Sequence, residues 1–375
     1  MKVRPPNQTF LEMTRACNFR CEHCFSTSGP VDKDQMSTED FYSVFDQLAE
    51  LGVFLVNMTG GEPLLRDDIL DLLEYTENYS EQIHLLFTNA SLWTEEFFDE
   101  FIKIWKTHPI DIQVSLDGHS YSTYGAARGG TQKDFERVTR TIKKLVDEGV
   151  RTVACFTVRK KTIGHMFETA QYALEELGVN AFHVIPLFAS GRAIPNYEEI
   201  AYTFEEWSNL VRDYTILKRD SLWGGLEKRL NLGFFTWYEV SYPLEQAGLL
   251  KEMKSVWNLD KEEFKSMYRK VFCEAGVTEL YIKSNGDVYP CVPSVDTEFL
   301  LGNVTETPIR TIWENSHWAN WFRTEARDVG KKEPCSTCEY SDVCCGGCRV
   351  SALILCHDKD VPDPRCPIVQ EYQSS

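Results

Sequence analysis

The chain has 375 residues, 43% of them hydrophobic, which is enough for a large domain and a smaller one around a sizeable buried core. Its 57 acidic residues outnumber 39 basic ones, and the net charge of −18 argues against a nucleic-acid-binding surface. Because the chain shows neither a signal peptide nor an apolar run of about 18 residues, we expect a cytoplasmic protein without a membrane partner.

The first half of the chain alternates strand-like and helix-like segments. Ser37 is the predicted N-cap of one helix, with Asp40 three residues on, and Gly52 is its predicted end. The pattern predicts strands over 8–14, 53–61, 82–89, 110–118, 150–158 and 180–187, and helices over 37–52, 65–78, 94–106, 133–149 and 163–178. Six such units predict an α/β fold, a parallel sheet in the form of an open or closed barrel with helices outside.

Polar or glycine-containing turns follow the first four predicted strands. They read CNFRCEHC from residue 17, TGGEP from 59, TNA from 88 and SLDG from 115. In barrels of this kind the chemistry lies at the carboxyl ends of the strands. These turns therefore mark the predicted active-site rim.

The pattern changes after residue 190. Residues 191–272 are rich in aromatics, and we expect helices over 204–220, 221–240 and 262–272, which either pack on one another or form a lid over the barrel. From Cys273 onward the chain has short strands, turns and cysteines, with a predicted hairpin turning at Asn285 and Gly286. The predicted organisation is a barrel over 1–190, a helical insert over 191–272 and a cysteine-rich unit over 273–375.

Cys17, Cys21 and Cys24 are spaced C-x3-C-x2-C. A structural zinc site needs four ligands, so here His23 or a distant residue would have to complete it. Three thiolates can instead hold a cubane iron–sulfur cluster with one iron left open for a substrate or cofactor, whereas clusters that only carry electrons usually have four cysteines. In a compartment where thiols stay reduced, clustered cysteines indicate metal rather than disulfides.

With these cysteines, the chain resembles the radical S-adenosylmethionine (SAM) family, whose fold is a partial (β/α)6 barrel. The GGEP turn is similar to the family's motif for the SAM amine, and the SLDG segment with the arginine after it is similar to its SAM carboxylate and ribose segment. The SAM-contacting residues that the resemblance implies are Gly60, Gly61, Glu62, Pro63, Asn89, Ser115 and Arg128. It also implies that the cluster passes an electron to SAM and that the resulting 5′-deoxyadenosyl radical abstracts a hydrogen atom from substrate; no catalytic side chain is identified.

The C-terminal cysteines resemble the SPASM extension of radical SAM enzymes. That resemblance implies two auxiliary [4Fe-4S] clusters besides the first, a nearer one on Cys273, Cys291 and Cys348 and a distal one on Cys335, Cys338, Cys344 and Cys366. Taken in isolation, the four-cysteine spacing fits zinc equally well.

The nearer set has three evident ligands, because some relatives carry a further cysteine after the first one and this chain does not. Its fourth site is then open, water-bound, or filled by Glu274, Glu279 or a distant residue. Cys155, Cys345 and Cys356 lie outside the ligand pattern: Cys155 is expected to be a small core residue and Cys345 a spare thiol, whereas Cys356 is a fourth ligand, a hydrogen-atom donor or a residue without a function.

The favoured function is oxidation or C–C or C–S cross-linking of a ribosomally synthesised precursor peptide, and the chain is similar to the mycofactocin maturase group. A flavodoxin or ferredoxin-type protein would supply electrons. Since the first strand begins near residue 8, we expect no N-terminal leader-binding domain. Either a separate protein then recognises the leader peptide, or the substrate has no leader.

Three alternatives remain. One is tetrapyrrole side-chain modification in a haem d1 or alternative haem pathway, because VCCGGCRVSAL is similar to those tails as well. A second is anaerobic sulfatase maturation, which Val292 after Cys291 argues against, since that group places an Asp there. The third is a multi-cluster electron carrier, which the three-cysteine motif and GGEP argue against.

Overall fold

A ten-stranded mixed sheet forms the centre of the computed structural model, which describes residues 3–266 and 273–375. The strand order is β10-β9-β8-β1-β2-β3-β4-β5-β6-β7. The six predicted strands are present and parallel as β1 (Gln8–Glu12), β2 (Leu55–Thr59), β3 (Ile83–Thr88), β4 (Ile110–Ser115), β5 (Thr152–Val158) and β6 (Ala181–Pro186).

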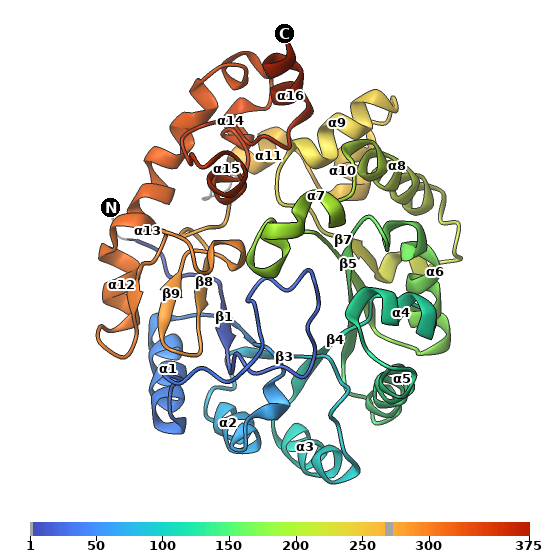
Figure 1. The fold of residues 1–375 in the computed structure, drawn as a ribbon, viewed down its shortest axis with the longest axis vertical. Helices are drawn as coiled ribbons and strands as arrows, with labels where there is room; N and C mark the ends of the chain where they lie inside the picture. Colours follow the sequence, from blue (N-terminus) through green and yellow to red (C-terminus); the bar gives the residue numbers. More distant parts are fainter. Residues whose placement is uncertain (1–2, 267–272) are drawn as a thin grey trace.

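Helices cover the outer face of these six strands (Figure 1). They are α1 (Thr38–Leu51), α2 (Ile69–Tyr75), α3 (Glu95–Thr107), α4 (Tyr121–Arg128), α5 (Gln132–Asp147) and α6 (Met166–Gln171). Outward-facing Leu11 and Leu86 are fully buried, whereas Phe10 and Phe87, one position away on the same strands, are half-buried and in contact on the inner face. The sheet ends at β7 and β10 instead of closing, so the predicted α/β partial barrel is confirmed.

Helix α1 begins and ends where its sequence predicts. Ser37 and Asp40 form a reciprocal capping box at its start, and Gly52 takes a left-handed φ of 90° at its end. The predicted 163–178 helix is less regular, because α6 stops at Gln171 and a π-helical turn, Tyr172–Glu176, follows it.

The insert contains helices but also one strand. The strand β7 (Leu230–Leu232) pairs in parallel with β6, so the helix predicted over 221–240 is wrong at this point. Residues 267–272, the end of the helix predicted over 262–272, lie outside the described residues. The helices are α7 (Tyr197–Ile200), α8 (Phe204–Asp220), α9 (Tyr238–Gln246), α10 (Glu252–Trp257) and α11 (Lys261–Ser266).

The cysteine-rich part shares its sheet with the barrel. The strands β8 (Glu279–Ile282) and β9 (Asp287–Tyr289) form the predicted hairpin, and Gly286 takes the positive φ of 89° that its turn requires. The strand β10 (Gly302–Asn303) adds to β9, while β8 pairs in parallel with β1. The sheet therefore continues from the barrel into the C-terminal unit.

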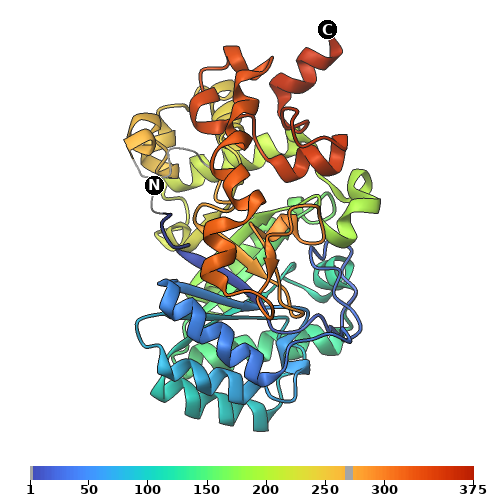
Figure 2. The ribbon, with the colours of Figure 1, turned by 90° about the vertical axis from the view of Figure 1, so that its left-hand side faces the viewer.

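Short helices complete the C-terminal unit, which lies above the barrel in Figure 2. They are α12 (Ile309–Asn315), α13 (His317–Arg323), α14 (Ser341–Cys344), α15 (Arg349–Cys356) and α16 (Pro367–Ser374). Across the described ranges, no helix combines the length and apolar character needed to cross a bilayer.

Candidate cofactor and metal sites

The loop between β1 and α1 carries Cys17, Cys21 and Cys24 at the carboxyl end of β1, as predicted. Backbone N–H groups of Phe19 and Ser28 donate to the sulfurs of Cys17 and Cys24, both at 3.4 Å. Burial raises the pKa of Cys17 to about 11, so this thiol stays protonated at neutral pH unless a metal displaces the proton. N–H groups directed at sulfur suit thiolates that bind a metal cluster.

A segment after β6 holds the cysteine loop in place. Arg192 donates from its backbone N–H to the Cys24 carbonyl at 2.9 Å, and from its guanidinium to the Cys21 carbonyl at 2.8 Å and to the Ser28 carbonyl. A Cβ on the neighbouring Gly191 would lie 2.2 Å from the Phe25 carbonyl oxygen. Sequence reasoning missed Arg192; its position just after a strand, on the same rim as the cysteines, was the available signal.

The GGEP turn is joined directly to the cysteine loop. Gly61 N–H donates to the Thr14 carbonyl and Glu62 N–H to the Ala16 carbonyl, each at 2.7 Å. A Cβ on Gly61 would lie 2.0 Å from the Ala16 carbonyl oxygen, and one on Gly60 would lie 2.4 Å from that of Thr14. The two glycines are thus required by close packing of the turn against the segment that leads into Cys17.

Glu62 is fully buried and hydrogen-bonded to the end of β3. Its carboxylate accepts from Thr88 Oγ1 at 2.7 Å and from the backbone N–H of Asn89 at 2.6 Å. Burial raises its pKa to about 7, against the effect of these hydrogen bonds. The side chain of Asn89 donates to Asn18 in the cysteine loop at 2.9 Å, so three predicted turns form one network.

Arg128, at the end of α4, is paired with a residue that the sequence interpretation did not select. Its Nε lies 2.9 Å from Oδ2 of Asp117, which is fully buried, and the Nε2 of His23 lies 3.6 Å from the same oxygen. Although burial opposes ionisation of Asp117, Arg128 holds its pKa below the ordinary value, whereas burial lowers the pKa of His23 to about 3. His23 therefore lies as a neutral imidazole against the carboxylate of Asp117.

The surroundings of Arg128 fit a polar ligand. Within the described ranges, the buried hydroxyl of Tyr124 and Nδ1 of His23 have no hydrogen-bond partner. Ser115 is half-buried at the end of β4, next to Cys155 of β5 in the strand register. Unpaired polar atoms near a guanidinium, together with a half-buried serine at a strand end, are compatible with a zwitterion such as SAM.

The three cysteines of the nearer auxiliary set pack on one apolar cluster. Cys273, Cys291 and Cys348 contact the group formed by Ala275, Phe299, Trp321, Phe322, Ala326 and Val350. Burial raises the pKa of Cys273 to about 12, with a further contribution from Cys348. Three half-buried cysteines on a shared apolar surface are a suitable donor set for a cluster.

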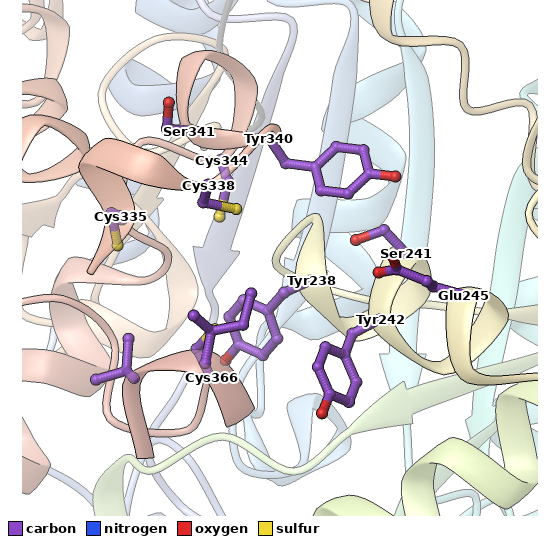
Figure 3. A pocket seen from close by; sticks show the side chains of 13 residues that line it. Tyr238, Ser241, Tyr242, Glu245, Cys335, Cys338, Tyr340, Ser341, Cys344 and Cys366 are labelled. Carbon is purple, nitrogen blue, oxygen red and sulfur yellow. The ribbon is translucent and has the colours of Figure 1, made fainter. Parts of the chain in front are cut away.

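The four cysteines of the distal set line one cavity, as Figure 3 shows. Cys335, Cys338, Cys344 and Cys366 come from the chain between α13 and α16. Tyr238 and Tyr242 of α9, together with Tyr340, line the same cavity. The sequence grouping of these four cysteines agrees with their placement, but the contribution of Tyr238 and Tyr242, which come from the insert, was not foreseen.

Asp363 connects the two auxiliary sets. Its buried carboxylate accepts from the backbone N–H of Cys348 at 2.9 Å, from the Tyr238 hydroxyl at 3.1 Å and from Arg365 at 2.9 Å. Its carbonyl accepts from the N–H of Cys366 at 3.1 Å. Burial opposes its ionisation, but Arg365 holds its pKa below the ordinary value.

The remaining cysteines lie apart from these donor sets. Cys155 is buried on β5, and burial raises its pKa to about 12, with the charge of Asp117 adding to the effect. Cys345 follows α14 in a left-handed conformation, and Cys356 ends α15 half-buried. Where the chain is described, no three His, Cys, Asp or Glu side chains converge as the ligands of one ion would.

Comparisons with known proteins agree with these motifs. The radical SAM superfamily profile matches residues 11–173, and that of the SPASM iron–sulfur cluster-binding domain matches residues 273–339. The mycofactocin maturase MftC of Mycolicibacterium smegmatis is 28% identical over 357 residues, covering 95% of this chain and 81% of the relative. The AdoMet-dependent heme synthase of Nitratidesulfovibrio vulgaris is also 28% identical, over 95% of this chain and 90% of the relative.

A solved structure has the same fold. Streptococcus suis SuiB, crystallised with its precursor peptide SuiA, superposes with a TM-score of 0.75 at 20% identity, covering 97% of this chain and 76% of SuiB. The similarity extends through both the barrel and the cysteine-rich unit.

Proposed function

Because the chain is a radical SAM enzyme with a SPASM iron–sulfur domain, we propose that it oxidises or cross-links side chains of a ribosomally synthesised precursor peptide. The observation that carries this proposal is the junction of the cysteine loop and the GGEP turn. Two backbone hydrogen bonds of 2.7 Å join these motifs at the carboxyl ends of β1 and β2. A cluster on the loop and a ligand on the turn would therefore lie next to each other.

Cys17, Cys21 and Cys24 would hold the first [4Fe-4S] cluster. When bound, cluster and SAM together supply a 5′-deoxyadenosyl radical that abstracts a hydrogen atom from substrate. The predicted SAM contacts are Gly60, Gly61, Glu62, Pro63, Asn89, Ser115 and Arg128. Asp117 fixes the Arg128 guanidinium by its 2.9 Å ion pair, which orients the remaining N–H groups for a carboxylate.

The cysteine-rich unit would hold two auxiliary clusters, giving three in total. Cys335, Cys338, Cys344 and Cys366 surround one cavity, and Cys273, Cys291 and Cys348 share an apolar cluster. We further propose that residues 1–190, 191–272 and 273–375 act as barrel, insert and auxiliary-cluster unit. Two clusters held by these half-buried cysteines would suit electron transfer out of an oxidative reaction.

A peptide substrate is supported by the relatives. One is named a mycofactocin maturase, and SuiB, of the same fold, was crystallised with a precursor peptide. Half-buried aromatic side chains on the inner face of the sheet, such as Phe10 and Phe87, would contact an apolar part of the substrate. A separate leader-binding protein, a flavodoxin or ferredoxin-type reductant and a cytoplasmic location belong to this proposal.

A tetrapyrrole substrate is the second candidate. It is favoured by the heme synthase relative, which matches this chain at the same identity as the maturase. The two candidates share the cluster and SAM chemistry and differ only in the substrate on the inner face of the barrel.

Anaerobic incubation of the reconstituted enzyme with SAM and dithionite tests the shared chemistry. We expect 5′-deoxyadenosine from the wild type and none from Cys17→Ala, while Cys356→Ala, outside the proposed donor sets, serves as the matched cysteine control. Equal yields from wild type and Cys17→Ala would contradict the radical SAM assignment of this loop.

The substrate is tested by adding a precursor peptide encoded near the gene, or a porphyrin carrying propionate side chains, and analysing the products by mass spectrometry. A peptide that loses hydrogen or carbon dioxide in step with 5′-deoxyadenosine formation supports the maturase proposal. Conversion of the porphyrin with no change in the peptide would favour the second candidate.

A further inference from the structure

The nearer auxiliary set offers three thiols, whereas a cubane cluster has four irons that each need a terminal ligand. Among the described residues, four oxygen-bearing side chains lie near these cysteines: Glu274, Glu279, Ser294 and Asp363. Asp363 is committed to its ion pair with Arg365 at 2.9 Å and to the Tyr238 hydroxyl at 3.1 Å. The Ser294 hydroxyl is committed to the backbone of Cys291, donating to its carbonyl at 2.7 Å and accepting from its N–H at 3.3 Å. The choice is therefore between the remaining two carboxylates.

Glu279 is held within the site by two hydrogen bonds. Its Oε1 accepts from the N–H of Val292, the residue directly after Cys291, at 3.1 Å, and its Oε2 accepts from Gln8 at 3.0 Å. Its backbone forms a bridge with Ala275, two residues after Cys273. The Glu279 carboxylate is thus tied to the segment after Cys291, and the Glu279 backbone to the segment after Cys273.

Burial distinguishes Glu279 from Glu274. Glu279 is 8% exposed and Glu274 is half-buried, although both accept from the same Gln8 amide. The described groups that donate to Glu279 are neutral, and the side chain beside it, that of Glu274, is a second carboxyl. Among the described residues no cation pairs with the Glu279 carboxylate, and burial of a carboxylate without a cation is unfavourable.

Glu279 also has the capacity to bind iron. An ionised carboxylate offers about four lone-pair sites, and Val292 and Gln8 occupy two of them. The same two donors orient the carboxylate, as hydrogen bonds commonly do for metal ligands.

We infer that Glu279 supplies the fourth protein ligand of the nearer auxiliary cluster, beside Cys273, Cys291 and Cys348. This inference rests on the proposal that the SPASM domain holds clusters. It makes the nearer cluster coordinatively complete, so that the cluster transfers electrons and the substrate binds elsewhere.

The test uses full-length protein in which Cys17, Cys21 and Cys24 are replaced by Ala, so that only auxiliary clusters are loaded. In this background Glu279→Gln keeps an acceptor for Val292 but removes the carboxylate, Glu279→Cys restores an iron ligand, and Glu274→Gln is the matched control. After anaerobic reconstitution, iron content, EPR spectra and midpoint potentials are measured before and after mild oxidation. The nearer cluster is identified as the EPR signal that Cys291→Ala removes.

We expect about 8 iron per chain in the background protein and in Glu274→Gln, both before and after oxidation. In Glu279→Gln oxidation should release about one iron and produce the EPR signal of a three-iron cluster, because one iron has no protein ligand. Glu279→Cys should keep all the iron but shift the EPR signal and potential of the nearer cluster.

Identical iron content, spectra and potentials in Glu279→Gln and Glu274→Gln would overturn the assignment of Glu279 and leave the proposed clusters intact. If Glu279→Gln fails to fold, an unshifted signal in Glu279→Cys has the same meaning. A background protein that binds no iron after reconstitution would overturn both this inference and the auxiliary-cluster proposal.

Discussion

At Gly61 a single methyl group would collide with the backbone of the cysteine loop. A Cβ there would lie 2.0 Å from the Ala16 carbonyl oxygen, a group that no side-chain rotation can move. We expect Gly61→Ala to displace the loop and reduce both iron binding at Cys17, Cys21 and Cys24 and 5′-deoxyadenosine formation by more than tenfold, which corresponds to about 1.4 kcal/mol.

The control for this variant is Gly164→Ala. Gly164 has open space around the Cβ position, so its substitution should leave both measurements unchanged. Normal iron loading in Gly61→Ala, measured by iron analysis of a variant lacking the auxiliary cysteines, would contradict the tight junction described here.

The pH dependence of the unfolding free energy is easiest to attribute to a single residue at His84. Burial, with a contribution from His108, lowers its pKa from 6.5 to about 3, and its Nδ1 lies 3.0 Å from Nε2 of His108. The unfolded chain therefore binds a proton below pH 6.5 that the folded chain does not, so this residue makes stability fall as the pH falls from 6.5 towards 3.

Replacing His84 by Leu should flatten this dependence. Between pH 7.5 and 5.5 the wild type should lose about 1.4 kcal/mol more unfolding free energy than His84→Leu, measured by urea denaturation of the loaded enzyme. His317→Gln, at an exposed position on α13, should behave like the wild type. Parallel curves for His84→Leu and wild type would refute this assignment.

Asp363 joins separate elements: the start of α15 at Cys348, α9 at Tyr238, and the segment leading to Cys366. Asp363→Ala would leave the nearly buried Arg365 without this carboxylate, although Glu239 remains 3.5 Å away. Removing one partner of a buried pair typically costs about 3–5 kcal/mol, and we expect a loss of that order in denaturant unfolding.

Asp360→Ala is the matched control, because the side chain of Asp360 is 52% exposed. Its effect should stay within about 0.5 kcal/mol. A similarly small effect in Asp363→Ala would mean that Glu239 and water compensate for the lost carboxylate.

Local sequence patterns predicted some elements well and others poorly. The capping box of α1 depends on Ser37, Asp40 and Gly52, all within one helix, so periodicity and cap chemistry were sufficient. The three-residue strand β7 is too short for a period to be recognised, and its pairing with β6 makes it a strand. A strand as short as β7 can be predicted only when the strand with which it pairs is known.

The same distinction applies to the candidate sites. Cys17, Cys21 and Cys24 and the GGEP turn could be predicted because each motif lies in one short stretch at a strand end. Asp117 and Arg192 also follow strands on the predicted rim, but this position alone did not single them out, because their importance comes from contacts with Arg128 and with the cysteine loop that form only in the folded chain. The contact of Gln8 with Glu279 joins residues 271 positions apart and leaves no trace in local sequence.

For the whole molecule, cluster removal should loosen one region selectively. We expect hydrogen exchange in cluster-free protein to accelerate over residues 335–366, because the four predicted ligands that line the distal cavity would lose the metal that holds them together. The strand β8 should keep its protection, because it is paired with β1 on one side and β9 on the other.

This prediction is checked by comparing exchange in reconstituted and chelator-treated enzyme by mass spectrometry. Equal acceleration over β8 and residues 335–366 would mean that the barrel and the auxiliary unit unfold together. No acceleration in either region would mean that the distal cavity is stable without metal.

The place of β1 between β8 and β2 affects how the protein is made. The ribosome completes β1 at Glu12 but does not reach β8 until Glu279. At a translation rate of about 5–20 residues per second, the edge of β1 that pairs with β8 therefore stays unpaired for roughly 10 to 60 s. A bare strand edge readily pairs with other chains. During translation the nascent chain therefore has to shield this edge, and a chain released before Glu279 would expose it permanently.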